Sequence, residues 1–349
     1  MTEPVLSVRD LVVRLSTGRG VVHAVNGVSL DVEPGGALGL VGESGSGKSV
    51  MSLAILRLLP RGGRIASGQV WFGGRDLTGL SPAEMRTVRG REIAMILQDP
   101  QSSLNPVLPV GEQIEEAIHA HERVTRRAAR ARAVELLGAV GIARPEEQLG
   151  RFPHQFSGGM RQRVMIAIAL ALRPRLLIAD EPTTALDVTV QAQVLELLKE
   201  LTDEVGAAVV LISHDLGIMA RMTQRIAVMY AGLVVESAPT RELFARPRHP
   251  YTVGLLRSIP RIAGARGALV PIDGSPPDLE RLPEGCPFAP RCAWRIDACW
   301  SANPALAVDA PEHLVACHNP AEPAETAVGR PIRPGFAPSP PPARREGVA

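Results

Sequence analysis

Short apolar runs alternate with amphipathic stretches over roughly the first 240 residues of the chain. Short apolar runs bounded by turn residues are typical of buried strands, and apolar positions spaced by three and four are typical of helices. This alternation predicts an α/β fold. We expect strands at residues 37–41, 93–97, 176–179, 207–212 and 226–230, a hairpin through Gly232 into 233–236, and a helix at 48–59.

Residues 111–172 show a helical pattern instead, with at least three segments and no convincing strand. We therefore expect a helical subdomain, at about 99–175, inserted in an α/β domain of residues 1–240. The apolar helix expected at 164–172 is far shorter than the roughly 18–20 residues that a membrane span needs, so we assign it to core packing.

The pattern changes near residue 239, where prolines become frequent and apolar periodicity weakens. We expect a small C-terminal domain at 241–325 and a disordered, proline- and alanine-rich tail at 326–349. All four cysteines lie in the small domain. The start of the chain lacks a basic segment followed by an apolar one, so we expect no signal peptide and a cytosolic chain. Cysteines in that compartment favour metal or redox chemistry over structural disulfides.

Composition narrows the function classes. Of the 349 residues, 45% are hydrophobic and 21% charged, which is typical of a globular protein with a sizeable core. The formal net charge is only +2, and aromatic residues make up 3%. Neither a basic surface nor a set of base-stacking aromatics is indicated, so we expect no nucleic-acid partner.

A phosphate-binding loop follows the first expected apolar strand. The run is Gly42, Glu43, Ser44, Gly45, Ser46, Gly47, Lys48 and Ser49, which fits the P-loop pattern G-x-x-x-x-G-K-[ST]. Its glycines let backbone N–H groups point at phosphate oxygens, and the helix that follows adds positive potential. We expect Lys48 to reach the β- and γ-phosphates and Ser49 to bind Mg²⁺.

Polar residues follow three further expected strands. Asp180 and Glu181 end the strand at 176–179, where ligands bind in such sheets. Asp180 suits Mg²⁺, and Glu181 is placed to activate the attacking water as a general base. Gln98 could bind Mg²⁺ and that water at once, and His214 could contact the γ-phosphate and orient Glu181.

A second candidate phosphate-binding helix end is formed by Ser157, Gly158 and Gly159, before the apolar helix. Ser157 is a good N-cap, and the glycines allow an anion to approach the backbone. The chain therefore has two candidate phosphate-binding helix ends but only one P-loop.

In their order along the chain, these motifs resemble those of ABC transporter ATPases over roughly residues 5–240. The resemblance implies a P-loop NTPase core in a head-to-tail dimer, with ATP and Mg²⁺ between the P-loop of one subunit and the signature of the other. Ser157, Gly158 and Gly159 would then contact the partner's ATP, and Asp187 would link the two sites. The early segment 14–17 has Leu15 where the family usually stacks an aromatic on adenine.

Segments 248–252 and 285–292 make the chain more similar to the ATPase subunits of oligopeptide/dipeptide importers, including nickel-importing relatives. The resemblance implies ATP-driven import of peptides or related solutes at the cytoplasmic side of the cell membrane. It also implies a second ATPase subunit (a paralogue), two transmembrane permease subunits, and indirectly an extracytoplasmic solute-binding protein. Two alternatives stay open: an ABC ATPase acting on nucleic acid or ribosomes, and a redox- or metal-sensing ATPase.

Cys286, Cys292, Cys299 and Cys317 give the spacing C-x5-C-x6-C-x17-C. Four thiolates suit tetrahedral Zn²⁺ or an iron–sulfur cluster, and the spacings are wider than the C-x2–4-C of most structural zinc sites. Some members of the resembled importer family carry a [4Fe–4S] cluster on this extension, which leads us to expect one here, with Zn²⁺ as the alternative. We expect it to be structural or redox-regulatory.

Overall fold

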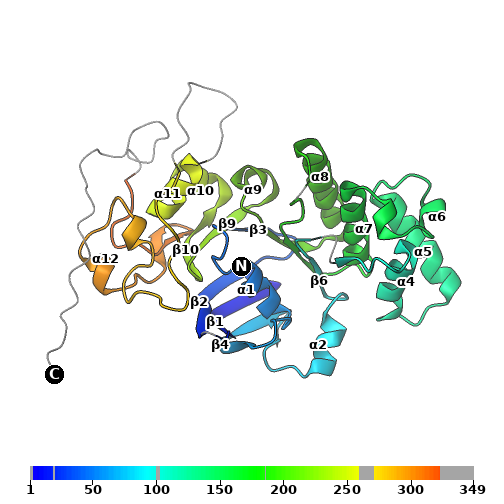
Figure 1. Cartoon of the computed structure of the whole chain (residues 1–349), viewed down its shortest axis with the longest axis horizontal. Helices are drawn as coiled ribbons and strands as arrows, with labels where there is room; N and C mark the ends of the chain where they lie inside the picture. The colour runs from blue at the N-terminus through cyan, green and yellow to red at the C-terminus, as the bar shows by residue number, and fades with distance from the viewer. Residues whose placement is uncertain (1–2, 19, 100–102, 185, 259–270, 323–349) are drawn as a thin grey trace.

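A computed structural model describes residues 3–18, 20–99, 103–184, 186–258 and 271–322. It contains two sheets and the helices that cover them (Figure 1). The smaller sheet consists of β1 (Leu6–Ser16), β2 (Val21–Val32), β4 (Gly63–Phe72) and β5 (Arg75–Asp76). The larger sheet consists of β3 (Ala37–Val41), β6 (Ile93–Ile96), β7 (Leu176–Asp180), β8 (Ala208–Ile212), β9 (Arg225–Tyr230), β10 (Leu233–Pro239), β11 (Ala307–Ala310) and β12 (His313–Val315).

The larger sheet has the strand order β11-β12-β10-β9-β3-β8-β7-β6. Strands β9, β3, β8, β7 and β6 run parallel, and β10, β12 and β11 extend the sheet in antiparallel pairing. The expected strands of this sheet are confirmed to within a residue at most ends, although β10 continues three residues beyond the expected 236. The smaller sheet, with the antiparallel order β2-β1-β4-β5, was not foreseen.

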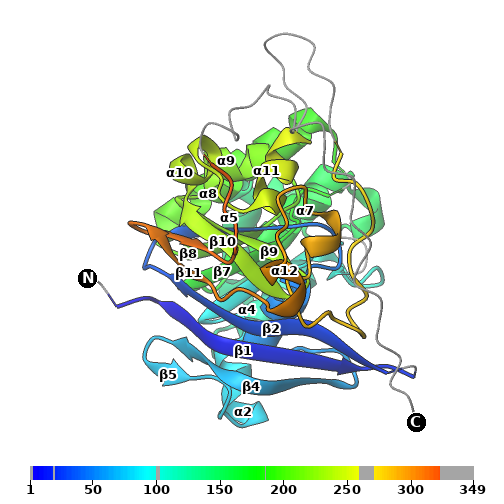
Figure 2. The same cartoon turned by 90° about the vertical axis from the view of Figure 1, so that its left-hand side faces the viewer.

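The helices surround these sheets. They are α1 (Lys48–Ile55), α2 (Pro82–Val88), α4 (Val110–His119), α5 (Arg126–Ala139), α6 (Pro145–Gln148), α7 (Gly158–Leu170), α8 (Val188–Val205), α9 (Leu216–Met222), α10 (Thr240–Ala245), α11 (Pro250–Arg257) and α12 (Ala298–Ser301). Two short 3-10 helices are η1 (Pro153–Gln155) and η2 (Ala289–Arg291). Figure 2 shows the smaller sheet as the lower layer and helices α8 to α11 as the upper layer, with the larger sheet between them.

Both faces of the larger sheet are buried at its parallel strands, where alternate residues of one strand join different cores. On β7, Leu177 and Ala179 pack in the cluster that includes the helical subdomain and α8. Leu176 and Ile178 pack in the cluster that includes α1 and the smaller sheet. Alternate residues of β7 are thus buried on opposite faces of the sheet, which explains why the strand is hydrophobic at consecutive positions.

The bounds of two helices differ from the expected ones. Helix α1 ends at Ile55, four residues before the expected end, because Arg57 adopts a left-handed backbone (φ 52°) and its guanidinium bonds the carbonyl of Leu80. Helix α7 starts at Gly158, directly after its N-cap, well before the expected residue 164. At its other end, α7 stops at Leu170, two residues before the expected end.

The C-terminal region, residues 240–322 as far as they are described, shares the larger sheet with the preceding α/β core. Strand β12 pairs with β10 through Val315–Glu236 and Leu314–Ser237. His313 and Glu236, both fully buried, are joined by a hydrogen bond of 2.7 Å between Nε2 and Oε1. The expected tail at 326–349 lies outside the described residues.

Candidate functional site

The candidate site lies at the carboxyl ends of the central parallel strands. Strand β3 leads into the P-loop, and β7 ends at Asp180. Ser213 and His214 follow β8, and Gln98 follows β6 by two residues. Because these strands are neighbours and parallel, their carboxyl ends meet at one edge of the sheet, which is where doubly wound sheets bind ligands.

The P-loop turns tightly because two of its glycines approach neighbouring backbone closely. A Cβ on Gly42 would lie 2.2 Å from the carbonyl oxygen of Met229, and one on Gly47 would lie 2.3 Å from that of Ala24. Gly47 also has a φ of 103°, a value that favours glycine. Gly47 caps α1 without a side-chain hydrogen bond, so the first turn of α1 faces the loop interior with free N–H groups.

Lys48 is 6% exposed and closes the loop from inside. Its Nζ donates to the carbonyl oxygens of Gly42 at 2.7 Å and Glu43 at 2.9 Å. Burial lowers the pKa of Lys48, and the carboxylates of Glu181, Asp180 and Glu43 oppose that effect. The ammonium is therefore held among anionic groups at the position where phosphate oxygens would compete for it.

Asp180 and Ser49 fit a magnesium site. Asp180 is 4% exposed, and its Oδ1 has no hydrogen-bond partner among the described residues. Burial raises the pKa of Asp180, and a hydrogen bond from Ser49 opposes the rise. A buried carboxylate oxygen without a partner, beside a serine hydroxyl, is a donor set that Mg²⁺ prefers. Two of the three predicted Mg²⁺ ligands thus lie together.

Glu181 lies at the centre of the polar cluster. Its Oε2 accepts hydrogen bonds from Gln98 Nε2 at 3.0 Å and from Thr184 Oγ1 at 2.9 Å. Its Oε1 lies 3.5 Å from His214 Nδ1. The backbone of Glu181 is in the left-handed region (φ 46°), a strained conformation for a non-glycine residue. The structure therefore brings together all three predicted catalytic side chains and adds Thr184, which the sequence had not suggested.

The Ser157 segment stands apart from these residues. Ser157 is exposed and caps α7, its Oγ accepting the Met160 N–H at 3.3 Å. Figure 1 shows α7 among helices α4 to α6, in a different lobe from α1. A Cβ on Gly159 would lie 2.6 Å from Val190 of α8, so this glycine allows close packing. Asp187 caps the same helix α8, accepting the Val190 N–H at 2.9 Å.

The hairpin stretch expected to face adenine holds Leu15 against the core cluster of the smaller sheet. Its neighbour Arg14 donates to the Asn26 side chain at 2.9 Å and to the Val25 carbonyl at 2.8 Å. Burial lowers the pKa of Arg14, and the nearby Arg64 lowers it further. The partly buried Leu15 side chain thus packs against the core of the smaller sheet.

The four cysteines do not form the expected metal centre in this structure. Among the described residues, no three or more His, Cys, Asp or Glu side chains are grouped so that they could hold a metal ion. All four thiols are free. Burial raises the pKa of Cys292 and of Cys317 to about 12, and also raises that of Cys286, so neutral thiols are favoured here. Neither the iron–sulfur cluster nor the zinc alternative is supported by this arrangement.

Sequence reasoning missed two side chains that contact the P-loop from the C-terminal region, Tyr251 and Arg291. The Tyr251 hydroxyl accepts the Glu43 N–H at 2.7 Å, and Arg291 pairs with the Glu43 carboxylate. Both partners are more than 200 residues from Glu43 along the chain. No local pattern signals such contacts, because they depend on tertiary packing alone.

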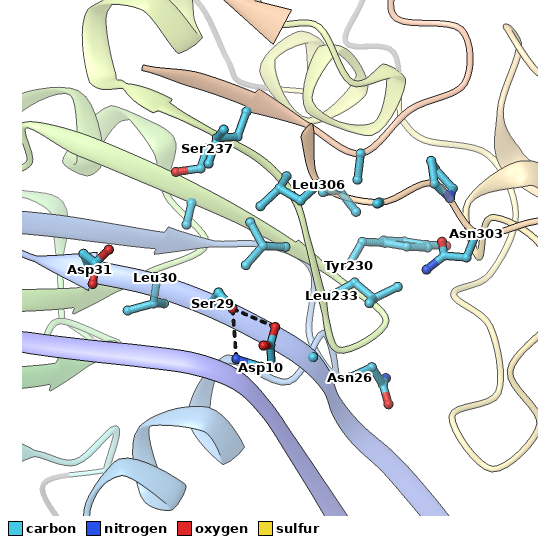
Figure 3. Close-up of a pocket in the computed structure, with 18 of the residues that line it drawn as sticks. Asp10, Asn26, Ser29, Leu30, Asp31, Tyr230, Leu233, Ser237, Asn303 and Leu306 are labelled. Atoms are coloured by element: carbon cyan, nitrogen blue, oxygen red, sulfur yellow. Dashed lines mark hydrogen bonds between the residues drawn. The ribbon is translucent and has the colours of Figure 1, made fainter. Parts of the chain in front are cut away.

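A cavity of about 900 Å³ opens beside these contacts, between β2, β10 and the segment around Leu306 (Figure 3). Tyr230, Cys286 and Phe288 form part of its wall, whereas its lining includes no residue of 42–49. The cavity is therefore a neighbour of the nucleotide site and not a part of it.

None of the helices in the described ranges is both long and apolar enough to cross a membrane.

Comparison with known families gives two matches. Residues 25–184 match the family described as ABC transporter. Residues 235–299 match the family described as oligopeptide/dipeptide transporter, C-terminal region. The first match contains the P-loop, Gln98, the Ser157 segment and Asp180–Glu181, and the second contains three of the four cysteines.

Individual relatives agree with these matches. The dipeptide transport ATP-binding protein DppD of Bacillus subtilis is 49% identical over 327 residues, covering 93% of this chain and 98% of the relative. The oligopeptide transport ATP-binding protein OppD of Mycobacterium tuberculosis is 53% identical over 90% of this chain, which spans only 52% of that relative. The solved dimeric ATP-binding cassette MJ0796, in a post-hydrolysis state with ADP and Pi, has a TM-score of 0.61 and 30% identity, covering 68% of this chain and 99% of that one.

Proposed function

This chain belongs to the ABC transporter ATPases and carries the C-terminal region of oligopeptide/dipeptide transporters, and from that premise we propose that it hydrolyses ATP to energise import of peptides or related solutes. The observation that carries the proposal is the grouping of Gln98, Glu181 and His214 beside Ser49 and Asp180. The two family matches favour transport over the nucleic-acid and redox-sensing alternatives.

Each side chain has a defined task in this proposal. Lys48, already surrounded by oxygen acceptors, binds the β- and γ-phosphates, while Ser49 and Asp180 hold Mg²⁺, with Gln98 as a further ligand. The metal, when bound, neutralises charge that develops on the phosphates. Glu181 accepts a proton from the attacking water, and His214 orients the Glu181 carboxylate from its other oxygen.

The proposed working unit is a head-to-tail dimer. Ser157 with Gly158 and Gly159 would contact the γ-phosphate of ATP bound to the partner's P-loop, and Asp187 would link the two sites. Support comes from the exposure of Ser157, from its separation from α1, and from the single copy of each motif. We propose a paralogous second ATPase, two permease subunits, and indirectly a solute-binding protein, with the chain peripheral at the cytoplasmic face of the membrane.

Reconstitution tests this proposal. The chain, co-purified with its partner ATPase and permease subunits in vesicles, should hydrolyse ATP faster when the binding protein and peptide are added. Ser157→Arg should abolish hydrolysis at the site that contains the partner's P-loop and spare the chain's own Lys48 site. Thr125→Arg is the matched control, because Thr125 caps α5 in the same subdomain in the same way. Loss confined to the Lys48 site would refute the head-to-tail arrangement, and peptide-independent hydrolysis would refute peptide import.

For the cysteine region, we propose that the four thiols, which are not grouped to hold a metal ion in the described structure, come together as thiolates when a metal centre is loaded, [4Fe–4S] with Zn²⁺ as the alternative. It rests on the donor set and on sulfur hydrogen bonding. Cys286, Cys292 and Cys317 each accept a backbone N–H from the residue two positions further along. Such bonds stabilise thiolate ligands. Anaerobic purification with iron, sulfide and zinc assays decides between the metals, and fresh protein without either would overturn the proposal.

A further inference from the structure

Arg291, from the C-terminal region, forms an ion pair with Glu43 of the P-loop. Arg291 directs Nη1 to Glu43 Oε2 at 2.7 Å and Nη2 to Glu43 Oε1 at 3.0 Å. The Arg291 side chain is 5% exposed and that of Glu43 27%. A bidentate ion pair of this kind fixes the orientation of the Glu43 carboxylate as well as its distance, which a single hydrogen bond does not.

Arg291 is itself held on several sides. Its Nε donates to the carbonyl oxygen of Asp273 at 2.9 Å and its Nη2 to that of Ile272 at 3.2 Å. Its guanidinium lies 5.9 Å from the ring centres of both Tyr230 and Phe288, and Nη1 reaches the Tyr230 hydroxyl at 3.3 Å. The guanidinium therefore acts as a fixed anchor, built by the C-terminal region, and not as a mobile surface charge.

A second contact holds the main chain of the same P-loop residue. The Glu43 N–H donates to the Tyr251 hydroxyl at 2.7 Å. Tyr251 is fully buried, and its ring centre lies 4.6 Å from that of Tyr230 and 5.4 Å from that of Phe288. Glu43 is thus bound through both its backbone and its side chain by one packed aromatic cluster. This cluster forms part of the wall of the cavity in Figure 3, where Tyr230 is labelled.

The C-terminal region also contacts the β1–β2 hairpin. The His23 N–H donates to the Leu279 carbonyl at 2.9 Å, and the Thr17 hydroxyl lies 3.1 Å from Glu280 Oε1. One region thus holds the P-loop and the neighbouring hairpin in a fixed relation.

These contacts bear on phosphate binding because Lys48 is hydrogen-bonded to the same residue, Glu43. Its ammonium is placed by the carbonyl oxygens of Gly42 and Glu43, so a turn of the Glu43 peptide would move Lys48. We propose that Arg291 and Tyr251 are positioning residues for the chain's own P-loop, through which the C-terminal region sets its affinity for ATP. The inference rests on the proposed ATPase function and extends it. The cysteine region, in which Arg291 lies between Cys286 and Cys292, is thereby linked to nucleotide binding in the same subunit.

Nucleotide binding by the purified full chain tests the inference. Arg291→Gln should weaken MgATP binding roughly tenfold, a common size for coupling between sites, and Arg291→Lys should fall between it and the wild type. Asp309→Asn is the matched control. It breaks the Arg248–Asp309 pair, 2.8 Å between Nε and Oδ2, which is similarly shielded in the same region but does not contact the P-loop. Melting temperatures are recorded for every variant, so that lost stability and lost affinity are separated.

A double-mutant cycle gives the decisive readout. If Arg291 acts through Glu43, Arg291→Gln added to Glu43→Gln should weaken ATP binding no further than Glu43→Gln alone. Glu43→Gln also serves if Arg291→Gln fails to fold, because it leaves the arginine in place. Unchanged ATP affinity in Arg291→Gln, or equal weakening by Asp309→Asn, would overturn the inference. A wild-type chain that binds no ATP would instead overturn the proposed function.

Discussion

The carboxyl edge of the parallel strands and the C-terminal region both contact the P-loop, yet the chain builds them in opposite ways. At the strand edge, each functional residue ends an apolar strand or follows one within two residues, so that Asp180, Glu181 and His214 are positioned by local secondary structure. In the C-terminal region, Arg291 reaches Glu43 across 248 positions of sequence, from a segment with one 3-10 turn. The residues proposed to act in hydrolysis are positioned by strands, whereas the residues proposed to adjust ATP binding are positioned by tertiary packing.

This difference separates two kinds of mutational effect. Changes at the strand edge should alter the chemical step, because we propose that those side chains act on the attacking water and the reacting phosphate. Changes in the C-terminal region should alter stability or nucleotide affinity, because its residues contact the loop from behind. The predictions below test this division, beginning with the largest expected effect.

Glu181→Gln should lower ATP turnover of the assembled transporter by roughly 10³-fold, within the range that a general base contributes, and leave ATP binding intact. The amide keeps the size of the side chain and can still accept the Thr184 hydroxyl, which bonds Glu181 at 2.9 Å. Steady-state hydrolysis and equilibrium ATP binding are measured on the same preparation.

The control is Glu196→Gln, which neutralises an exposed carboxylate on α8 that pairs with Arg221 at 3.4 Å. It should leave turnover unchanged. Turnover of Glu181→Gln near that of the wild type would remove Glu181 as the base and would place the chemical step outside the strand edge.

The strand edge was predictable for a physical reason. A buried parallel strand reads as an unbroken apolar run, and its carboxyl end marks the ligand edge, so Asp180, Glu181 and Gln98 could be grouped from the sequence alone. The helices of the segment 111–172 were likewise predicted from their period. Helix α1 was predicted too long because its end depends on the left-handed backbone of Arg57, which residue type does not signal.

The smaller sheet and the C-terminal contacts could not be predicted in the same way. Strands β1 and β4 pair with two register shifts, so their alternation of apolar and polar residues is interrupted. Strand β12 joins the larger sheet through a pairing of only two residue pairs with β10. The cysteine spacing predicted a metal centre that the described side chains do not form, because spacing alone does not determine how four thiols converge.

The free energy of unfolding should fall with acidification because of His249, a residue of the C-terminal region. Burial lowers the pKa of His249 to about 3, and its Nδ1 accepts the Tyr251 N–H at 3.1 Å. An unfolded chain protonates near 6.5, so below that pH the unfolded state binds more protons than the folded state. Between pH 7 and pH 5 this residue alone should cost about 2 kcal/mol of stability, and the loss should continue down to about pH 3.

Urea unfolding at several pH values measures this effect. His249→Asn should flatten the pH dependence in that window, since asparagine can still cap α11 but does not titrate there. The Glu236 carboxylate accepts the His249 backbone N–H at 2.9 Å and remains available to the variant. An unchanged slope in His249→Asn would assign the pH dependence to other groups and would weaken the view that this region acts on stability.

The smallest effect should come from Tyr251→Phe, which tests the junction of the two regions. The variant keeps the ring that packs 4.6 Å from Tyr230 but removes the hydroxyl that accepts the Glu43 N–H. An N–H left without its partner costs about 1 kcal/mol or somewhat more, which corresponds to a few-fold weaker binding of ATP if the cost falls on the loop in its phosphate-binding shape. Turnover at saturating ATP should stay close to that of the wild type, because Glu181 and His214 are untouched. A raised KM with an unchanged kcat therefore supports a positioning role, whereas a lowered kcat at saturating ATP would show that the C-terminal region takes part in the chemical step and would erase the division between the two regions.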